Sequence, residues 1–148
     1  MREGRCVMMR NEKKGMTAGE IADKICEIAP EALQETWDNS GFLAGSRKHP
    51  VTKVLTCLDL DFSVLKEAER LGCEMIVTHH PLLFSGIKKL TDEDPAGRLI
   101  RQLVQHDIAV YSCHTPFDKT KGGNNDVLAG VLKLSNVRNL AGEKVGSP

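Results

Sequence analysis

The sequence is poor in aromatic residues, in net charge and in long hydrophobic runs. Aromatic side chains make up 4% of the 148 residues: one tryptophan, one tyrosine and four phenylalanines. Twenty basic and twenty acidic side chains give a formal net charge of zero. Dedicated nucleic-acid binders combine a basic surface with stacking aromatics, so the composition argues against that class. No apolar run approaches the ~18 residues of a membrane-spanning helix, so we predict no membrane span.

The net charge of zero combines two unlike parts. Residues 1–15 hold five basic and two acidic side chains, so this segment carries +3 and the remaining 133 residues carry −3. The segment lacks the apolar stretch of a secretory signal peptide, and we interpret residues 1–15 as a mobile basic tail. Residues 16–140 have the length and composition of one globular domain. Residues 141–148 are expected to form a flexible C-terminal tail.

Five cysteines occur, an odd number, and no two form a C-x-x-C pair. Without a secretory signal, this pattern predicts reduced thiols and a cytoplasmic location. Cys113 beside His114 is the candidate for a catalytic thiol. Neighbouring residues in a strand point to opposite faces, so we favour the alternative that the cysteines are small buried hydrophobic residues.

Hydrophobic spacing alternates between helical and strand periods along the domain. Thr17-x-x-Glu20 matches a capping box and precedes isoleucines at helical spacing. Gly72 can terminate a later helix, and the short apolar runs suit buried parallel strands. The expected helices are 18–29, 64–71, 95–104 and 125–132, and residues 31–36 can add a further helical turn. The expected strands are 54–59, 75–78 and 108–113, and residues 37–41 and 45–50 are expected to be turns or loops. This order predicts an α/β layered fold with a mainly parallel sheet.

Polar side chains follow each of the three predicted strands directly. They are Asp59 and Asp61 after the first strand, His79 and His80 after the second, and His114 and Asp118 after the third. Parallel strands end at one edge of their sheet, and open α/β sheets bind ligands beyond that edge. We therefore expect these histidines and carboxylates to lie close together.

Histidine and carboxylate side chains together are typical ligands of divalent metals. His79 and His80 stand at a strand end before a proline, where the backbone turns and both rings can face one cavity. Their separation suits two neighbouring ions better than one, and Asp118 can complete or bridge them. The alternative is that the histidines are ordinary polar residues at a loop edge.

Five segments, in this order, resemble those of a known family. They are Trp37-Asp38-Asn39-Ser40-Gly41-Phe42-Leu43, Leu58-Asp59-Leu60, Ile76-Val77-Thr78-His79-His80-Pro81-Leu82, His114-Thr115-Pro116-Phe117-Asp118 and Gly122-Gly123-Asn124-Asn125-Asp126-x-Leu128-Ala129. They are similar to those of the NIF-three-like family, whose members are called GTP cyclohydrolase I type 2 homologs. The resemblance covers about residues 16–140, and these residues match only the N-terminal half of the family pattern.

The resemblance implies a metal-dependent hydrolase-like protein in a ring-shaped homo-oligomer. Its dinuclear centre would hold divalent ions (Zn, Mn or Fe, two per complete site). By motif, His79 and His80 match metal ligands and Asp118 matches a bridging or terminal carboxylate. His114 matches either a ligand or a residue that supports one. The cluster around Trp37 is expected to shape the fold and the rim of the cavity.

Two departures from the family pattern bear on function. The segment from His114 to Asp118 has Thr-Pro-Phe in its middle where the family usually has Asn-Leu, which adds a rigid proline. Family members also carry a C-terminal half that supplies a further His-x-x-x-Glu pair, and no histidine follows His114 here. The resemblance therefore predicts an incomplete ligand set, as in an N-terminal fragment, part of a split protein or a diverged member.

Two functions remain open at this level. In the first, metal-activated water hydrolyses a small heterocyclic or phosphate-bearing substrate, and His114 or Asp59 assists proton transfer. In the second, the chain is a non-catalytic assembly module that binds metal only with a partner chain.

Overall fold

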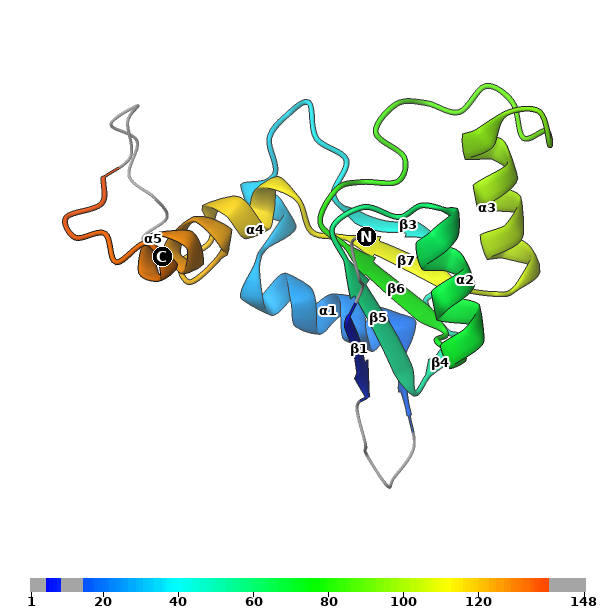
Figure 1. Cartoon of the computed structure of the whole chain (residues 1–148), viewed down its shortest axis with the longest axis horizontal. Coiled ribbons are helices and arrows are strands. Elements are labelled where there is room, and N and C mark those ends of the chain that lie inside the picture. Colours follow the sequence, from blue (N-terminus) through cyan, green and yellow to red (C-terminus); the bar gives the residue numbers. More distant parts are fainter. Residues whose placement is uncertain (1–4, 9–14, 139–148) are drawn as a thin grey trace.

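The computed structural model describes the backbone of residues 5–8 and the whole of residues 15–138. Its centre is a five-stranded sheet with the order β1-β5-β6-β7-β3 (Figure 1). The strands are β1 (Arg5–Met8), β3 (Gly41–Ala44), β5 (Lys53–Cys57), β6 (Met75–Thr78) and β7 (Ala109–Ser112). The three central strands run parallel, and the outer strands β1 and β3 are antiparallel to their neighbours. The predicted layered α/β fold is confirmed.

Helices cover both faces of this sheet, and each face has its own hydrophobic core. Val54, Met75 and Ala109 pack with α1 (Ala18–Ile28) on one face. The next residue along each strand, Leu55, Ile76 or Val110, packs with α2 (Phe62–Leu71) and α3 (Pro95–Gln105) on the other. This alternation follows from the two-residue period of a strand, and it makes the central strands a rigid support for whatever follows them.

The helix ends follow the signals in the sequence. Thr17 and Glu20 form the expected capping box at the start of α1. Gly72 ends α2 in the left-handed conformation, with φ 65°, which glycine adopts without a steric penalty. Asp94 caps α3, with Pro95 in its first turn.

Several elements were not predicted. They are the edge strands β1 and β3, the two-residue strands β2 (Met16–Thr17) and β4 (Pro50–Val51), and the short helix α4 (Thr115–Lys119). The 3-10 turn η1 (Glu31–Leu33) agrees with the helical turn expected over residues 31–36. The last helix, α5 (Asn124–Val131), agrees with the prediction. None of the helices in the described part of the chain combines the length and apolar character that a bilayer crossing requires.

The strand β1 differs from the basic tail predicted for residues 1–15. Arg5–Met8 pair antiparallel with Lys53–Thr56 of β5, because the outer edge of β5 offers unpaired backbone groups. The other tail predictions concern residues 1–4, 9–14 and 141–148, which lie outside the described residues.

Candidate metal centre

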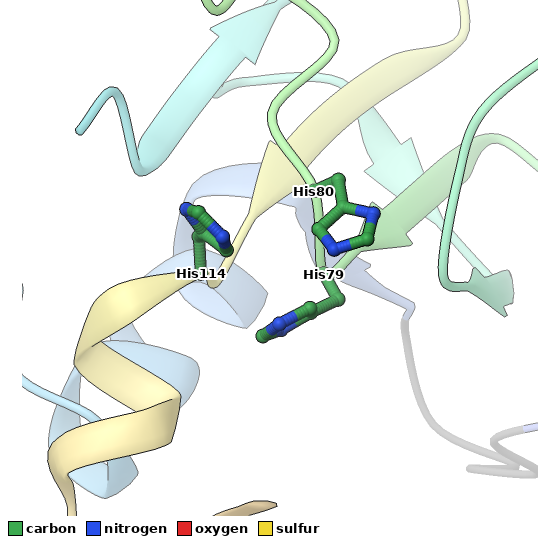
Figure 2. Close-up of side chains that lie close together, drawn as sticks. All are labelled: His79, His80 and His114. Carbon is green, nitrogen blue, oxygen red and sulfur yellow. The ribbon is translucent and has the colours of Figure 1, made fainter.

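Three histidines converge where β6 and β7 end. His79 and His80 follow β6, and His114 follows β7, immediately before α4 (Figure 2). Their ring centroids are 5.0 Å apart for His79 and His80, 5.0 Å for His79 and His114, and 5.5 Å for His80 and His114. One ring nitrogen from each histidine lies within 4.8 Å of the others. The prediction that side chains at the strand ends lie close together is therefore confirmed for these three histidines.

The His79 ring is fixed by the backbone of the neighbouring strand end. Its Nδ1 lies 3.1 Å from the carbonyl oxygen of Cys113, and the side chain is only 17% exposed. A carbonyl oxygen can only accept, so in this bond Nδ1 carries the proton. The amide nitrogen of Asn124 lies farther from the same atom, at 3.4 Å.

His80 is paired with a carboxylate on the adjacent strand end. Its Nδ1 lies 2.6 Å from Oδ1 of Asp59, just after β5, and both side chains are about half exposed. This pair is the part of the cluster that solvent reaches most easily.

His114 is held by a buried carboxylate. Its Nδ1 lies 2.9 Å from Oδ1 of Asp38, whose side chain is fully buried. The same carboxylate also accepts hydrogen bonds from Asn39, Ser40 and Thr115. Burial alone would raise the pKa of Asp38, but the hydrogen bonds from Thr115, His114 and Ser40 outweigh it and hold that pKa well below its usual value.

The three histidines thus share one bonding pattern. In each, Nδ1 faces an oxygen acceptor: the carbonyl of Cys113, the carboxylate of Asp59 or the carboxylate of Asp38. Histidines that bind metals typically donate one ring N–H to such an oxygen, which fixes the ring and leaves the other nitrogen to bind the ion. The Nε2 atoms are therefore the nitrogens left for a ligand.

The predicted carboxylates divide between two roles. Oδ1 of Asp118 lies 3.7 Å from Nε2 of His79 and accepts a hydrogen bond from the Asn124 amide at 3.0 Å. Asp118 therefore borders the cluster beside His79. The carboxylate of Asp61 instead caps α2 through Ser63 and Val64, so it has a local structural role.

The thiols near this edge are poor nucleophiles. Burial raises the pKa of Cys113 to about 11, and burial with the nearby charges of Asp59 and Asp61 raises the pKa of Cys57 to about 12. Both side chains are therefore protonated at neutral pH, whereas a cysteine nucleophile acts as the thiolate. The sequence-based preference for structural cysteines agrees with this environment.

Two residues at the site, Asp38 and Asn124, were not predicted as partners of the cluster. Asp38 lies in a predicted turn, and the carboxylate holds His114 from 76 positions away in the chain. Asn124 begins α5 and contacts both His79 and Asp118. Both belong to segments that carry the family resemblance, which is the signal that marks them in the sequence.

Known proteins resemble this chain in sequence and in fold. A sequence model of the Duf34/NIF3 family (NGG1p interacting factor 3) matches residues 16–147. A GTP cyclohydrolase 1 type 2 homolog of Clostridium perfringens is 44% identical over 117 residues, which cover 79% of this chain and 45% of the relative. A relative of the same name from Bacillus subtilis is 37% identical over 128 residues, 86% of this chain and 34% of the relative.

Proteins of known structure also resemble this chain in fold. A Bacillus cereus protein related to NIF3 has a TM-score of 0.80 at 36% identity, covering 84% of this chain and 34% of that one. Reduced HcgD from Methanocaldococcus jannaschii has a TM-score of 0.75 at 34% identity, covering 88% and 52%. The chain spans less than half the length of the two curated relatives. It belongs to the Duf34/NIF3 family.

Proposed function

We propose that this chain is a metal-dependent, hydrolase-like protein whose metal ligands include His79, His80, His114 and Asp118. The observation that carries the proposal is the shared orientation of the three histidines, each with Nδ1 against an oxygen acceptor. Three independent partners from three loops hold the rings in this way. Metal-binding histidines typically have such an oxygen partner. His49 also has Nδ1 against a carboxylate oxygen, that of Asp107, so the proposal depends on the convergence of three rings held in this way and not on any one pairing.

The donor set fits a divalent transition metal. Imidazole nitrogens suit Zn and Fe, and carboxylate oxygens extend the set to Mn. Ligand nitrogens stand about 2 Å from Zn, so nitrogens on one ion are at most about 4 Å apart. Ring nitrogens within 4.8 Å of one another need only small side-chain adjustments to reach that spacing. By the same spacing, Oδ1 of Asp118, at 3.7 Å from Nε2 of His79, can share an ion with that histidine or bridge to a second one.

A divalent metal supplies Lewis acidity, which polarises a carbonyl or phosphoryl oxygen of a substrate. The residues of this chain supply orientation. Asp38 and the Cys113 carbonyl hold two rings that are largely screened from water, and Asp59 holds the more exposed His80. Of the two residues considered for proton transfer, Asp59 is the better exposed to solvent. The substrate proposed is a small molecule. The family resemblance implies that a complete metal site also takes ligands from a His-x-x-x-Glu pair, which does not occur in these 148 residues.

Elemental analysis of purified, extensively dialysed protein tests this function. We expect bound Zn, Mn or Fe in the wild type and its loss in His79→Ala and His80→Ala. The chain offers matched controls in His49 and His106, which pair with Asp107 and Glu69 away from the cluster. Alanine variants of these two histidines should keep the metal. A folded wild type that holds no metal, or equal loss in the control variants, would refute the proposal.

The second candidate is an assembly module, and α5 favours it. No residue of α5 is buried, and its apolar side chains are more than half exposed at Val127, Leu128 and Val131. Contiguous apolar surface of this kind marks protein interfaces. We propose that copies of the chain associate through it as a homo-oligomer. Light scattering tests this: oligomers should dissociate in Val131→Glu, and a wild type that is monomeric at all concentrations would exclude it.

A cytoplasmic location is also part of the proposal. Cys26, Cys57, Cys73 and Cys113 are free thiols, and free thiols are typical of reducing compartments.

A further inference from the structure

The scarce aromatic residues of this chain are unevenly placed. Tyr111 is buried in the core against α1, and Phe117 packs against the same core. Phe42 lies under the guanidinium of Arg47, and Phe62 lies under that of Arg98. These four aromatic rings therefore have packing roles within the fold.

The two remaining aromatics are exposed, and both lie beside the histidine cluster. Trp37 is 58% exposed and Phe84 is 54% exposed. The Trp37 ring centroid lies 6.1 Å from that of Phe84 and 6.0 Å from that of His114, and Phe84 lies 6.5 Å from His114. Exposing two large rings forgoes the stabilisation that their burial would give, so their placement next to candidate metal ligands calls for a functional reason.

The chain fixes the two aromatics with respect to each other. Trp37 precedes the Asp38 carboxylate that holds His114, and Phe84 lies in the loop that follows His80. A hydrogen bond from the Asn39 side chain to the Leu83 carbonyl joins these two segments. The rings are tilted at 52° and so do not stack face to face, and both side chains are more than half exposed, so a ligand can reach them.

Phe84 also lines a hollow of about 440 Å³ formed by residues 82–89 with Asp94 and Ala96. This volume lies within the range of small-molecule sites, about 300–1,000 Å³. Trp37 and the three histidines do not line this hollow, so a planar ring placed against Trp37 and Phe84 would meet the hollow through Phe84 and would lie beside His114.

We infer that Trp37 and Phe84 form an aromatic platform that binds a planar aromatic or heteroaromatic ring of the substrate and presents the rest of that molecule to the histidine cluster. This inference rests on the proposed metal-dependent function. Stacking on an exposed aromatic is tolerant of the exact ring but requires a π-face. The platform thus selects planar ring compounds over saturated ones of similar size.

The unique tryptophan provides the test, because Trp37 is the only one in the chain and its fluorescence reports on the platform alone. Guanosine serves as the ring probe and ribose as the control without a ring. We expect saturable quenching by guanosine and none by ribose. Phe84→Ala should weaken guanosine binding about tenfold, Phe84→Tyr should restore it, and Val104→Ala, an exposed apolar change on α3, should leave it unchanged.

Metal content measured on the same samples separates this inference from the proposed function. Protein that retains metal but shows no quenching by guanosine, or equal quenching in Phe84→Ala, overturns the platform and leaves the metal centre standing. Protein that lacks metal refutes the metal centre, and the fluorescence still decides on the ring site. Quenching by ribose equal to that by guanosine also overturns the platform.

Discussion

Replacing Asp38 by asparagine removes the charge that holds His114 while keeping the size of the side chain. Oδ1 of Asp38 accepts from the backbone of Asn39 and from His114, and Oδ2 accepts from Ser40 and from the backbone and hydroxyl of Thr115. An amide NH₂ in either position faces at least one N–H that then has no acceptor. One charge-assisted bond is worth about 1.5–3 kcal/mol, and an unsatisfied buried donor costs about 1–3 kcal/mol. We therefore expect Asp38→Asn to lower the free energy of unfolding by about 3 kcal/mol at neutral pH.

The pH dependence of this loss has a definite sign. Because the folded-state pKa of Asp38 is lowered, its stabilisation is fully present above the unfolded pKa of about 4 and is lost as the pH falls toward the folded value. The difference in the free energy of unfolding between the wild type and Asp38→Asn should therefore shrink below about pH 4. Urea unfolding of both proteins across this range measures it. Asp92→Asn, which breaks an exposed ion pair with Arg101, is the control and should cost less than about 1 kcal/mol. A loss for Asp38→Asn no larger than the control, or one that persists in acid, would refute the argument.

Three further predictions concern other parts of the chain. A Cβ on Gly123 would lie 1.9 Å from the backbone oxygen of Phe117, so Gly123→Ala should destabilise the protein by about 1–3 kcal/mol in thermal unfolding. Gly130→Ala meets nothing within 4 Å on exposed α5 and should stabilise it by up to about 1 kcal/mol; a loss of stability in that variant would contradict the described helix. Burial raises the pKa of Cys57 to about 12 and of Cys113 to about 11, so iodoacetamide should alkylate both thiols much more slowly in folded than in urea-unfolded protein at neutral pH. Peptide mass mapping measures this, and rapid alkylation of the folded protein would show that the partly buried Cys57 and the buried Cys113 are more accessible than described.

The central strands and the three histidines could be predicted because their signals are local. Short apolar runs mark β5, β6 and β7, and parallel strands bring whatever follows them to one edge. The rule therefore placed His79, His80 and His114 together from the sequence alone. It also grouped Asp61 with them, although that carboxylate serves the first turn of α2.

The remaining features depend on contacts between distant residues. The strands β1 and β3 are four residues each and exist through pairing with β5 and β7. Asp38 meets His114 across 76 positions, and Trp37 meets Phe84 across two loops. Residue spacing does not encode such encounters, since they follow from the order of strands in the sheet. Helix α4 was missed because it is five residues long and begins beside Pro116, which also suits a turn.

Cobalt titration is the measurement that tests the central claim most directly, because tetrahedral and octahedral Co²⁺ differ in their visible absorption. The wild type should bind Co²⁺ saturably, with the visible absorption spectrum of Co²⁺ coordinated by histidine nitrogens. The spectrum should disappear when His79, His80 and His114 are replaced together by alanine. It should persist when His49 and His106 are replaced, because their Asp107 and Glu69 partners lie outside the cluster. A wild type that shows no such spectrum, or a triple variant that binds Co²⁺ as the wild type does, would contradict the metal centre.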